Sequence, residues 1–151
     1  MILKFLFSTN STPGIILPDF ITYRNAEETL IARGIETGVS INVFEDLGIK
    51  LGHTYTSKSS DLDYIPKNKF TALLETDCVK NTYLSLRFKN ISKRTYFDQY
   101  GTGTTLEFDA YNLVDLYASH NLLKDRLSLF VQVNNLFNSN YVETLGYTTL
   151  G

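Results

Sequence analysis

The residues best suited to holding a ligand lie in one polar stretch, Asn90–Ala110, in which cations and aromatic side chains alternate closely. The candidate binding residues in this stretch are Arg94, Tyr96, Phe97 and Tyr100. A guanidinium group beside aromatic rings can hold an anionic chelate that itself carries aromatic groups, through charge and ring stacking. The same aromatic residues can instead pack the loop onto its neighbours, and the sequence leaves both interpretations open.

Catalytic chemistry has little support in this chain. His53 falls on the apolar register of its strand, and His120 directly follows Ser119, so in a strand these two side chains point to opposite faces and cannot form a nucleophile–base pair. Charged residues recur on the polar register, where a hydrated wall with mutually offsetting charges explains them better than acid–base chemistry. We therefore expect no enzyme activity and no catalytic residues.

Metal, cofactor and nucleic-acid sites are equally poorly supported. Asp61-Leu62-Asp63 has two spaced carboxylates but neither the glycine turn nor the closing Glu of a calcium loop. Gly101-Thr102-Gly103 lacks the strand–helix context of a phosphate-binding loop. Cys78 is the single cysteine and has no neighbours at metal-ligand spacing. A net charge of −2 with no basic run gives no footprint for nucleic acid. We expect no metal and no cofactor.

The elements that carry these residues are strands, because apolar residues recur with a period of two. Ile35–Val43 and Leu47–Tyr55 alternate around a very short turn at Glu45-Asp46, which predicts a hairpin. Similar alternation marks strands within 70–75, 82–89, 113–119 and 127–134. A further strand is expected near Asp19–Arg24, with Asn25–Thr29 as a loop end. This makes about seven strands, or eight if Ile2–Phe7 pairs.

Charge placement and connection lengths refine this picture. The strand charges all fall on the polar register, as a bilayer or a half-buried soluble sheet would select: Glu36, Lys50, Glu75, Arg87, Lys89 and Asp115. Short joins near 45–46, 78–81 and 121–125 alternate with long polar ones at 57–68, 90–110 and 138–151. Short turns on one side and long loops on the other are the habit of outer-membrane barrels. The pattern therefore favours a membrane barrel over a soluble sheet.

The C-terminal stretch Tyr111–Gly151 has the most specific pattern. Two alternating runs flank a short polar turn, and Asn134-Asn135-Leu136-Phe137-Asn138 follows, with Tyr141 just after. This order resembles the C-terminal end of the β-barrel of TonB-dependent outer-membrane receptors, where a Leu-Val-Asp-Leu strand, a tight turn and a strand ending in Val-Asn-Asn-Leu-Phe-Asn precede an outer loop. Further stretches that resemble the same family are Tyr23–Glu36, Leu51–Thr56 and Ile65–Asn68.

The resemblance implies a barrel of about 22 strands with a plugged lumen, whose plug domain binds the energy-coupling protein TonB. The extent of the resemblance divides the chain into two parts. Residues 1–18, with Pro13-Gly14 and Pro18, are expected to be an irregular N-terminal segment outside the resemblance, and Met1–Phe7 does not match a secretory signal. Residues 19–151 are expected to be a partial TonB-dependent receptor β-barrel with its final strand missing.

We predict an all-β fold: an antiparallel up-and-down transmembrane β-barrel segment forming a curved meander and an incomplete barrel. The resemblance implies part of a Gram-negative outer-membrane receptor that takes up a scarce nutrient, such as a ferric siderophore, haem or vitamin B12 (cobalamin). This chain would supply barrel wall and outer loops. Its partners would be outer-membrane lipid, the plug and barrel strands missing from this sequence, the TonB system through that absent plug, and the small-molecule nutrient.

An alternative is a small self-contained ligand-binding β-barrel, in the outer membrane or soluble. That alternative requires Met1–Phe7 to act as an eighth strand and to pair with Leu127–Asn134, whereas a receptor fragment leaves an open, curved sheet with free edges. An outer-membrane barrel enzyme is a third reading, and the placement of the histidines argues against it.

Overall fold

The computed structural model describes residues 2–16, 24–58, 64–97, 103–123 and 126–144. These residues form β-strands without any helix long and apolar enough to cross a membrane. In chain order the described strands are β1 (Ile2–Ile16), β2 (Arg24–Phe44), β3 (Leu47–Lys58), β4 (Asn68–Val79), β5 (Thr82–Ile91), β6 (Arg94–Phe97), β7 (Thr105–Phe108), β8 (Tyr111–Leu122) and β9 (Leu127–Val133).

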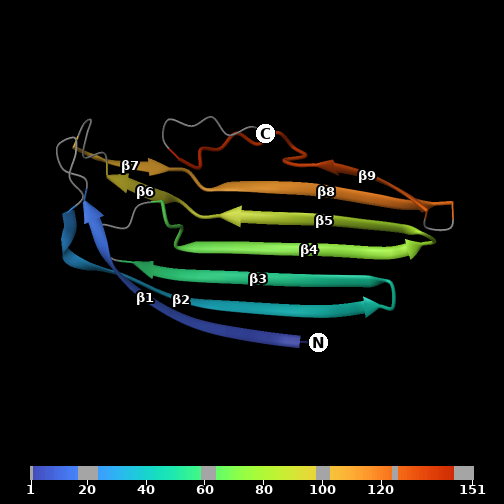
Figure 1. Cartoon of the computed structure of the whole chain (residues 1–151), viewed down its shortest axis with the longest axis horizontal. Coiled ribbons are helices and arrows are strands. Elements are labelled where there is room, and N and C mark those ends of the chain that lie inside the picture. The colour runs from blue at the N-terminus through green and yellow to red at the C-terminus, as the bar shows by residue number, and fades with distance from the viewer. Residues whose placement is uncertain (1, 17–23, 59–63, 98–102, 124–125, 145–151) are drawn as a thin grey trace.

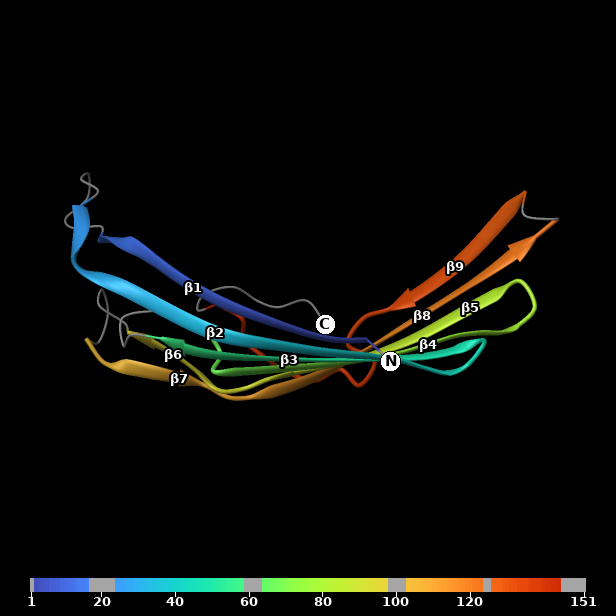
Figure 2. The same cartoon turned by 90° about the horizontal axis from the view of Figure 1, so that it is seen from below.

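Seven of these strands form one antiparallel sheet in the order β1-β2-β3-β4-β5-β8-β9, and β6 and β7 form a small second sheet (Figure 1). The edge strands β1 and β9 rise on the same side of the middle strands, so the sheet is curved (Figure 2). In the described part of the chain β1 pairs with β2 and β9 pairs with β8, and the sheet stays open. The predicted fold class is confirmed. The pairing of Met1–Phe7 with Leu127–Asn134 that a self-contained barrel requires is contradicted.

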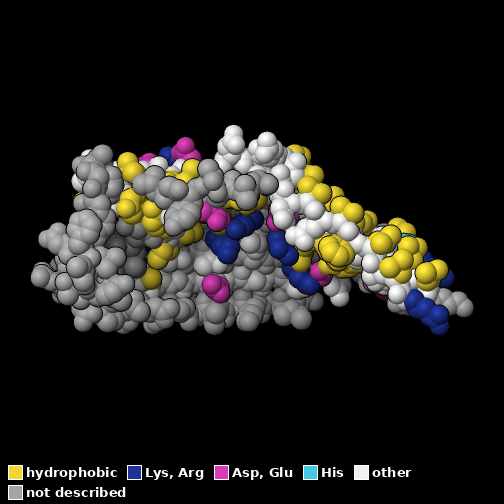
Figure 3. Space-filling view, turned by 45° about the horizontal axis from the view of Figure 1, so that its top comes forward, with side chains coloured by type: hydrophobic (Ala, Val, Ile, Leu, Met, Phe, Trp, Pro, Cys, Tyr) yellow, Lys and Arg dark blue, Asp and Glu magenta, His cyan; other side chains and the backbone are white. Residues whose placement is uncertain are grey.

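Directly opposite residues of neighbouring strands show which side chains share a face. Arg87 lies opposite Asp115, and Glu75 lies opposite Ser85. Followed across the sheet, this register places the predicted charges on one face, here called the polar face: Glu36, Lys50, Glu75, Arg87, Lys89 and Asp115. Figure 3 shows a group of charged side chains in the middle of the visible surface, with hydrophobic ones to its left and along the arm on the right. The predicted register is confirmed.

The opposite face, here called the apolar face, carries large hydrophobic side chains that remain exposed, among them Ile35, Leu51, Leu74, Leu86, Leu129 and Val131. Few apolar side chains are buried anywhere in the described residues, and the core cluster consists of Ile91, Tyr111 and Leu113. A single curved sheet has no second layer to cover it, so its apolar face must meet another apolar medium or partner.

The two ends of the sheet differ as predicted. Short turns join β2 to β3, β4 to β5 and β8 to β9 at one end, on the right in Figure 1. The turn between β4 and β5 is only two residues long, and Asn81 adopts a φ of 60° there. Asn tolerates this left-handed conformation better than most residues, which suits it to so tight a hairpin. The long connections lie at the opposite end, here called the loop end.

The N-terminal part differs from the prediction. Residues 1–18 were expected to be an irregular segment, with Ile2–Phe7 as a possible eighth strand. In the structure β1 (Ile2–Ile16) pairs along its length with β2, with a register shift between Pro13 and Ile15. Asn25–Thr29, expected as a loop end, lies inside β2. Most of the strand expected at 19–24 lies outside the described residues, and the domain division at residue 18 stays a prediction.

The physical reason is the length of β2. Its 21 residues span roughly 70 Å at about 3.3 Å per residue, more than twice the ~30 Å thickness of a hydrocarbon layer. Where a hairpin continues beyond the part of the sheet that carries the exposed apolar face, its strands keep their backbone hydrogen bonds. Their side chains no longer need to alternate between apolar and polar. The period-two signal therefore ends before the ladder does.

The same reason explains a second correction, because the stretch Asn90–Ala110 was expected to be a loop and contains the β6–β7 hairpin. The pairing of Ile91 with Tyr111 ends the β5–β8 ladder, and that of Arg94 with Phe108 begins the next one in the same register. Ser92, between the two ladders, does not pair across the hairpin, and its backbone N–H donates to the carbonyl of Asn68 on β4 at 3.0 Å. The hairpin is thus a continuation of β5 and β8 with a local break.

Two glycines on the polar face of β2 give a test of the β2–β3 ladder. A Cβ at Gly34 would lie 2.8 Å from the backbone oxygen of Tyr55, whereas one at Gly38 would lie 3.8 Å from that of Leu51. We expect Gly34→Ala to lower the free energy of unfolding by about 1–3 kcal/mol, because a backbone must move. Gly38→Ala is the matched control and should be neutral or slightly stabilising, because Ala reduces the entropy lost on folding.

The measurement is urea unfolding of the two variants in detergent micelles, compared with the parent protein. Equal effects of the two substitutions would contradict the close approach of β3 to Gly34.

Candidate functional site

Two groups of side chains on the described sheet are candidates for function. The first, here called the wall network, crosses the polar face nearer the turns and consists of Lys50, Glu75, Tyr83, Tyr117 and Phe130. The second, here called the loop-end cluster, joins the long connections and consists of Tyr64, Arg94, Tyr96, Phe108, Tyr111 and Tyr141.

The wall network links neighbouring strands through their polar-face side chains. Lys50 Nζ lies 2.5 Å from Glu75 Oε1, and the hydroxyl of Tyr83 donates to Glu75 Oε2 at 3.3 Å. The ring of Tyr117 lies edge-on to that of Tyr83, with centroids 6.0 Å apart, and stacks on Phe130 at 6.2 Å. The network therefore crosses β3, β4, β5, β8 and β9. The ion pair is solvent-accessible and therefore adds little to stability.

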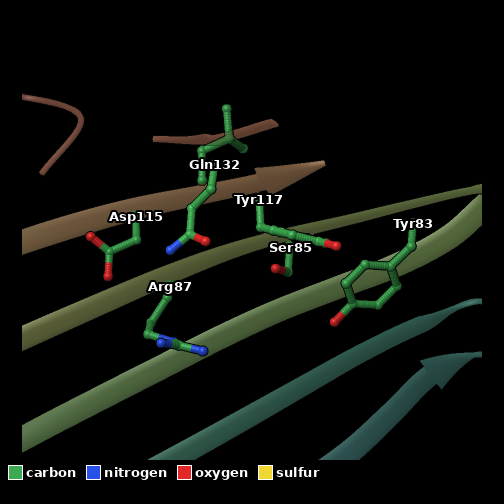
Figure 4. Close-up of a pocket in the computed structure, with 7 residues that line it drawn as sticks. Tyr83, Ser85, Arg87, Asp115, Tyr117 and Gln132 are labelled. Atoms are coloured by element: carbon green, nitrogen blue, oxygen red, sulfur yellow. The ribbon is translucent and has the colours of Figure 1, made fainter. Parts of the chain in front are cut away.

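A shallow pocket of about 250 Å³ adjoins this network (Figure 4). Its lining residues are Tyr83, Ser85, Arg87, Asp115, Leu116, Tyr117 and Gln132. Asp115 also accepts a hydrogen bond from the backbone N–H of Asn135 at 3.0 Å, which ties β8 to the segment after β9. This surface offers charge, hydroxyl and amide groups to whatever lies against the polar face, without a nucleophile held by a base.

The histidines lie away from that surface. His53, in the middle of β3, and His120, near the end of β8, are on the apolar face. They lie within hydrogen-bond distance of Asn68 Oδ1 (3.2 Å) and Thr82 Oγ1 (2.8 Å), respectively. Ser119 and His120 are paired to successive residues of β5 and so point to opposite faces, as predicted. Among the described residues no group of three or more His, Cys, Asp or Glu side chains is arranged to hold a metal ion.

At the loop end, Tyr64 joins the connection between β3 and β4 to the β6–β7 hairpin. Its backbone N–H donates to the carbonyl of Thr95 at 2.9 Å. Its ring stacks on Tyr96 with centroids 4.9 Å apart and lies 5.6 Å from the ring of Phe108. These contacts hold together two connections that are separated in sequence.

Arg94 is the centre of the loop-end cluster, and only 6% of its surface is exposed. Its guanidinium carbon lies 5.3 Å from the ring centroid of Tyr111 and 5.8 Å from that of Phe108. Nη1 donates to the carbonyl of Glu143 at 3.2 Å, and Nη2 donates to that of Val142. Its buried Nε has no hydrogen-bond partner among the described residues. Such a buried donor costs about 1–3 kcal/mol, which partly offsets the other contacts.

Tyr111 completes the attachment of the segment after β9. Its ring stacks on Tyr141 with centroids 4.5 Å apart, and its hydroxyl donates to Glu143 Oε1 at 3.2 Å. Tyr141 packs against the buried cluster that contains Ile91 and Leu113. The segment of residues 139–144 therefore lies on the polar face at the loop end, where its Tyr141 packs against the buried apolar cluster of the described sheet.

Comparison with known proteins identifies the architecture. The family model described as "TonB dependent receptor-like, beta-barrel" matches residues 4–136. This chain belongs to the TonB-dependent receptor β-barrel family. The family comprises outer-membrane receptors and transporters. None of the curated proteins matches the chain.

Solved structures show the same fold as this TonB-dependent receptor segment. A mutant of the ferric enterobactin receptor PfeA from Pseudomonas aeruginosa is 19% identical with a TM-score of 0.65, over 78% of this chain and 18% of that one. The FrpB iron transporter from Neisseria meningitidis is 20% identical with a TM-score of 0.65, over 89% of this chain and 25% of that one. The chain therefore spans a quarter or less of the length of these two neighbours.

The predicted binding residues of this TonB-dependent receptor segment have different environments. Arg94 and Tyr96 lie in the loop-end cluster and contact other loop residues. Phe97 is 48% exposed at the end of β6. Tyr100 lies outside the described residues, as do Asp61, Asp63 and most of the Gly101–Gly103 stretch. Contact of any of the four with a ligand stays a prediction.

The sequence reasoning missed four members of the loop-end cluster: Tyr64, Phe108, Tyr111 and Tyr141. A usable signal existed for two of them, because Tyr111 begins a strand of the polar register and Tyr141 belongs to the C-terminal motif. Tyr64 and Phe108 occur in stretches without periodicity, and only the three-dimensional fold brings them together.

The stacking of Tyr64 on Tyr96 can be measured by a double-mutant cycle. We expect Tyr64→Ala and Tyr96→Ala to show a coupling of about 0.5–1.5 kcal/mol in the free energy of unfolding, because either substitution alone removes the ring contact. Tyr64→Ala combined with Tyr83→Ala is the control pair, since Tyr83 lies near the turns, and its effects should add. Strict additivity of the Tyr64 and Tyr96 effects would contradict the stacking.

Proposed function

We propose that this chain is part of an outer-membrane TonB-dependent receptor that takes up a scarce nutrient, for which it supplies barrel wall and outer loops. The proposal assigns the chain no catalytic role. The apolar face contacts membrane lipid, the polar face borders the lumen, the short turns lie in the periplasm and the loop end lies outside the cell. The TonB system acts through a plug domain that fills the lumen.

The observation that carries this proposal is the division of the open sheet into two chemically opposite faces. In lipid, each unpaired backbone group costs several kcal/mol, so the free edges of β1 and β9 require further strands. A receptor barrel of about 22 strands supplies them. Membership of the receptor family supports the same conclusion.

We propose an iron chelate of the ferric siderophore class as the nutrient. Support comes from the two solved neighbours, whose descriptions name a ferric enterobactin receptor and an iron transporter. The exposed Phe97, with the predicted Tyr100, would contact the chelate at the loop end. Haem and vitamin B12 are the competing substrates, and competition binding of ferric siderophore, haemin and cobalamin to outer membranes that contain the chain distinguishes the three.

One prediction of this proposal concerns the size of the native polypeptide. Intact-mass measurement on the outer-membrane fraction of the native organism should find the peptides of this chain in a species several-fold heavier than 17.2 kDa. A membrane-embedded species near 17.2 kDa would overturn the proposal, because that polypeptide would have to close its barrel by another route, such as assembly of several chains.

A second prediction tests the orientation of the two faces. Leu86 is 40% exposed on the apolar face of β5, and Ser85 is its neighbour on the polar face. We expect Leu86→Lys to cost about 2–4 kcal/mol, because the ammonium group would lie near the middle of the bilayer. Ser85→Lys is the matched control and should be tolerated, because it introduces the same charge on the hydrated face.

The measurement is the fraction of outer-membrane protein that migrates as the folded, heat-modifiable form in unheated gels. A loss of folded protein with Ser85→Lys but not with Leu86→Lys would reverse the proposed orientation.

A further inference from the structure

The strongest unassigned feature of the described residues is the burial of Arg94 against the segment of residues 139–144. Buried arginines are rare, and they are normally paired with an acid. Here the guanidinium group donates instead to two successive backbone carbonyls, those of Val142 and Glu143. Backbone carbonyls carry no sequence information, so this arrangement fixes the path of the segment whatever side chains it presents.

Aromatic residues around Arg94 strengthen its attachment to the segment of residues 139–144. Tyr111 and Phe108 lie within 6 Å of the guanidinium carbon at 5.3 and 5.8 Å, where cation–π attraction adds to the hydrogen bonds. Tyr111 also binds the side chain of Glu143. The segment of residues 139–144 is thus held at two kinds of group: Arg94 binds its backbone carbonyls, and Tyr111 binds the side chain of its Glu143.

We infer that Arg94 is a positioning residue that latches the segment of residues 139–144 onto the polar face of the wall. The inference rests on the proposed function, in which this segment belongs to an outer loop at the mouth of the lumen. The latch holds that loop inward, over the cluster of Ile91, Tyr111 and Leu113. The role of Arg94 is therefore to shape the mouth of the barrel, and contact with the nutrient is left to residues such as Phe97.

Protease access measures the latch directly, because a protease needs an extended, released segment and its cleavage rate follows the population of the open form. A Glu-specific protease can cut after Glu143, within the latched segment, and after Glu107, within the β6–β7 hairpin. The experiment uses the full chain in outer-membrane preparations, and mass spectrometry of the fragments separates the two cuts.

We expect Arg94→Met to raise the rate of cleavage after Glu143 by roughly ten- to a hundredfold, the range expected for losing hydrogen bonds to a charged group. Cleavage after Glu107 should change by less than about twofold, because the β6–β7 pairing does not depend on the latch. Lys93→Met removes a neighbouring charge whose ion pairs with Glu107 and Asp109 are long and exposed, and it should leave the cut after Glu143 unchanged.

Two further variants keep the test decisive if Arg94→Met assembles poorly. Tyr111→Phe removes only the hydroxyl that binds Glu143 and should raise cleavage there by roughly fivefold. Arg94→Lys keeps the charge but not the forked pair of donors, and its rate should fall between those of the parent and Arg94→Met.

An unchanged rate after Glu143 in Arg94→Met and Tyr111→Phe would overturn the latch. An equal rise at Glu143 and Glu107 would overturn it as well, because Arg94 would then support the fold generally. Cleavage needs no nutrient and no energy-coupling protein, so the latch can fail while the receptor assignment stands. Conversely, a native species near 17.2 kDa would sink the receptor assignment and leave the cleavage result intact.

Discussion

The hydrogen-bonded ladder between neighbouring strands is the interaction on which the rest of this structure depends. Each strand's backbone donors and acceptors are satisfied by the next strand, which is the requirement that a bilayer imposes most strictly. Because side chains alternate along a ladder, this one constraint also separates the chemistry of the two faces. Leu86 and Arg87 are adjacent in sequence, yet they belong to opposite surfaces of the wall.

The ladder also decides how much of the fold could be predicted from the sequence. In the middle of the main sheet apolar and polar side chains have to alternate along each strand, and charges such as Lys50 and Asp115 fix the register without ambiguity. Beyond that part of the sheet the ladder continues on backbone hydrogen bonds alone. The first half of β2 and the β6–β7 hairpin therefore left no periodic signal, and both were predicted as loops or irregular chain.

The candidate site was predictable only in part, for a different physical reason. The sequence placed Arg94 among aromatic residues in a long connection, which is correct. It could not reveal that the guanidinium group meets the carbonyls of Val142 and Glu143, 48 and 49 residues away. Backbone carbonyls are present at every position, so no residue type marks the partner. Arg94 is thus a buried residue that contacts another loop, while its predicted contact with a ligand stays a prediction.

The distribution of burial agrees with that change of role. In the receptor that we propose, the middle of the sheet needs no core, because lipid and lumen would cover its two faces. The loop end has no lipid to cover it, and there the chain builds its own small core from Ile91, Tyr111 and Leu113. Arg94 and Tyr111 fasten a loop over that core by contacts that can be broken singly. A loop held by a few polar and aromatic contacts over a rigid wall can open and reclose without disturbing the ladder beneath it. In the proposed receptor, that separation would let the mouth of the barrel change shape while the wall stays intact.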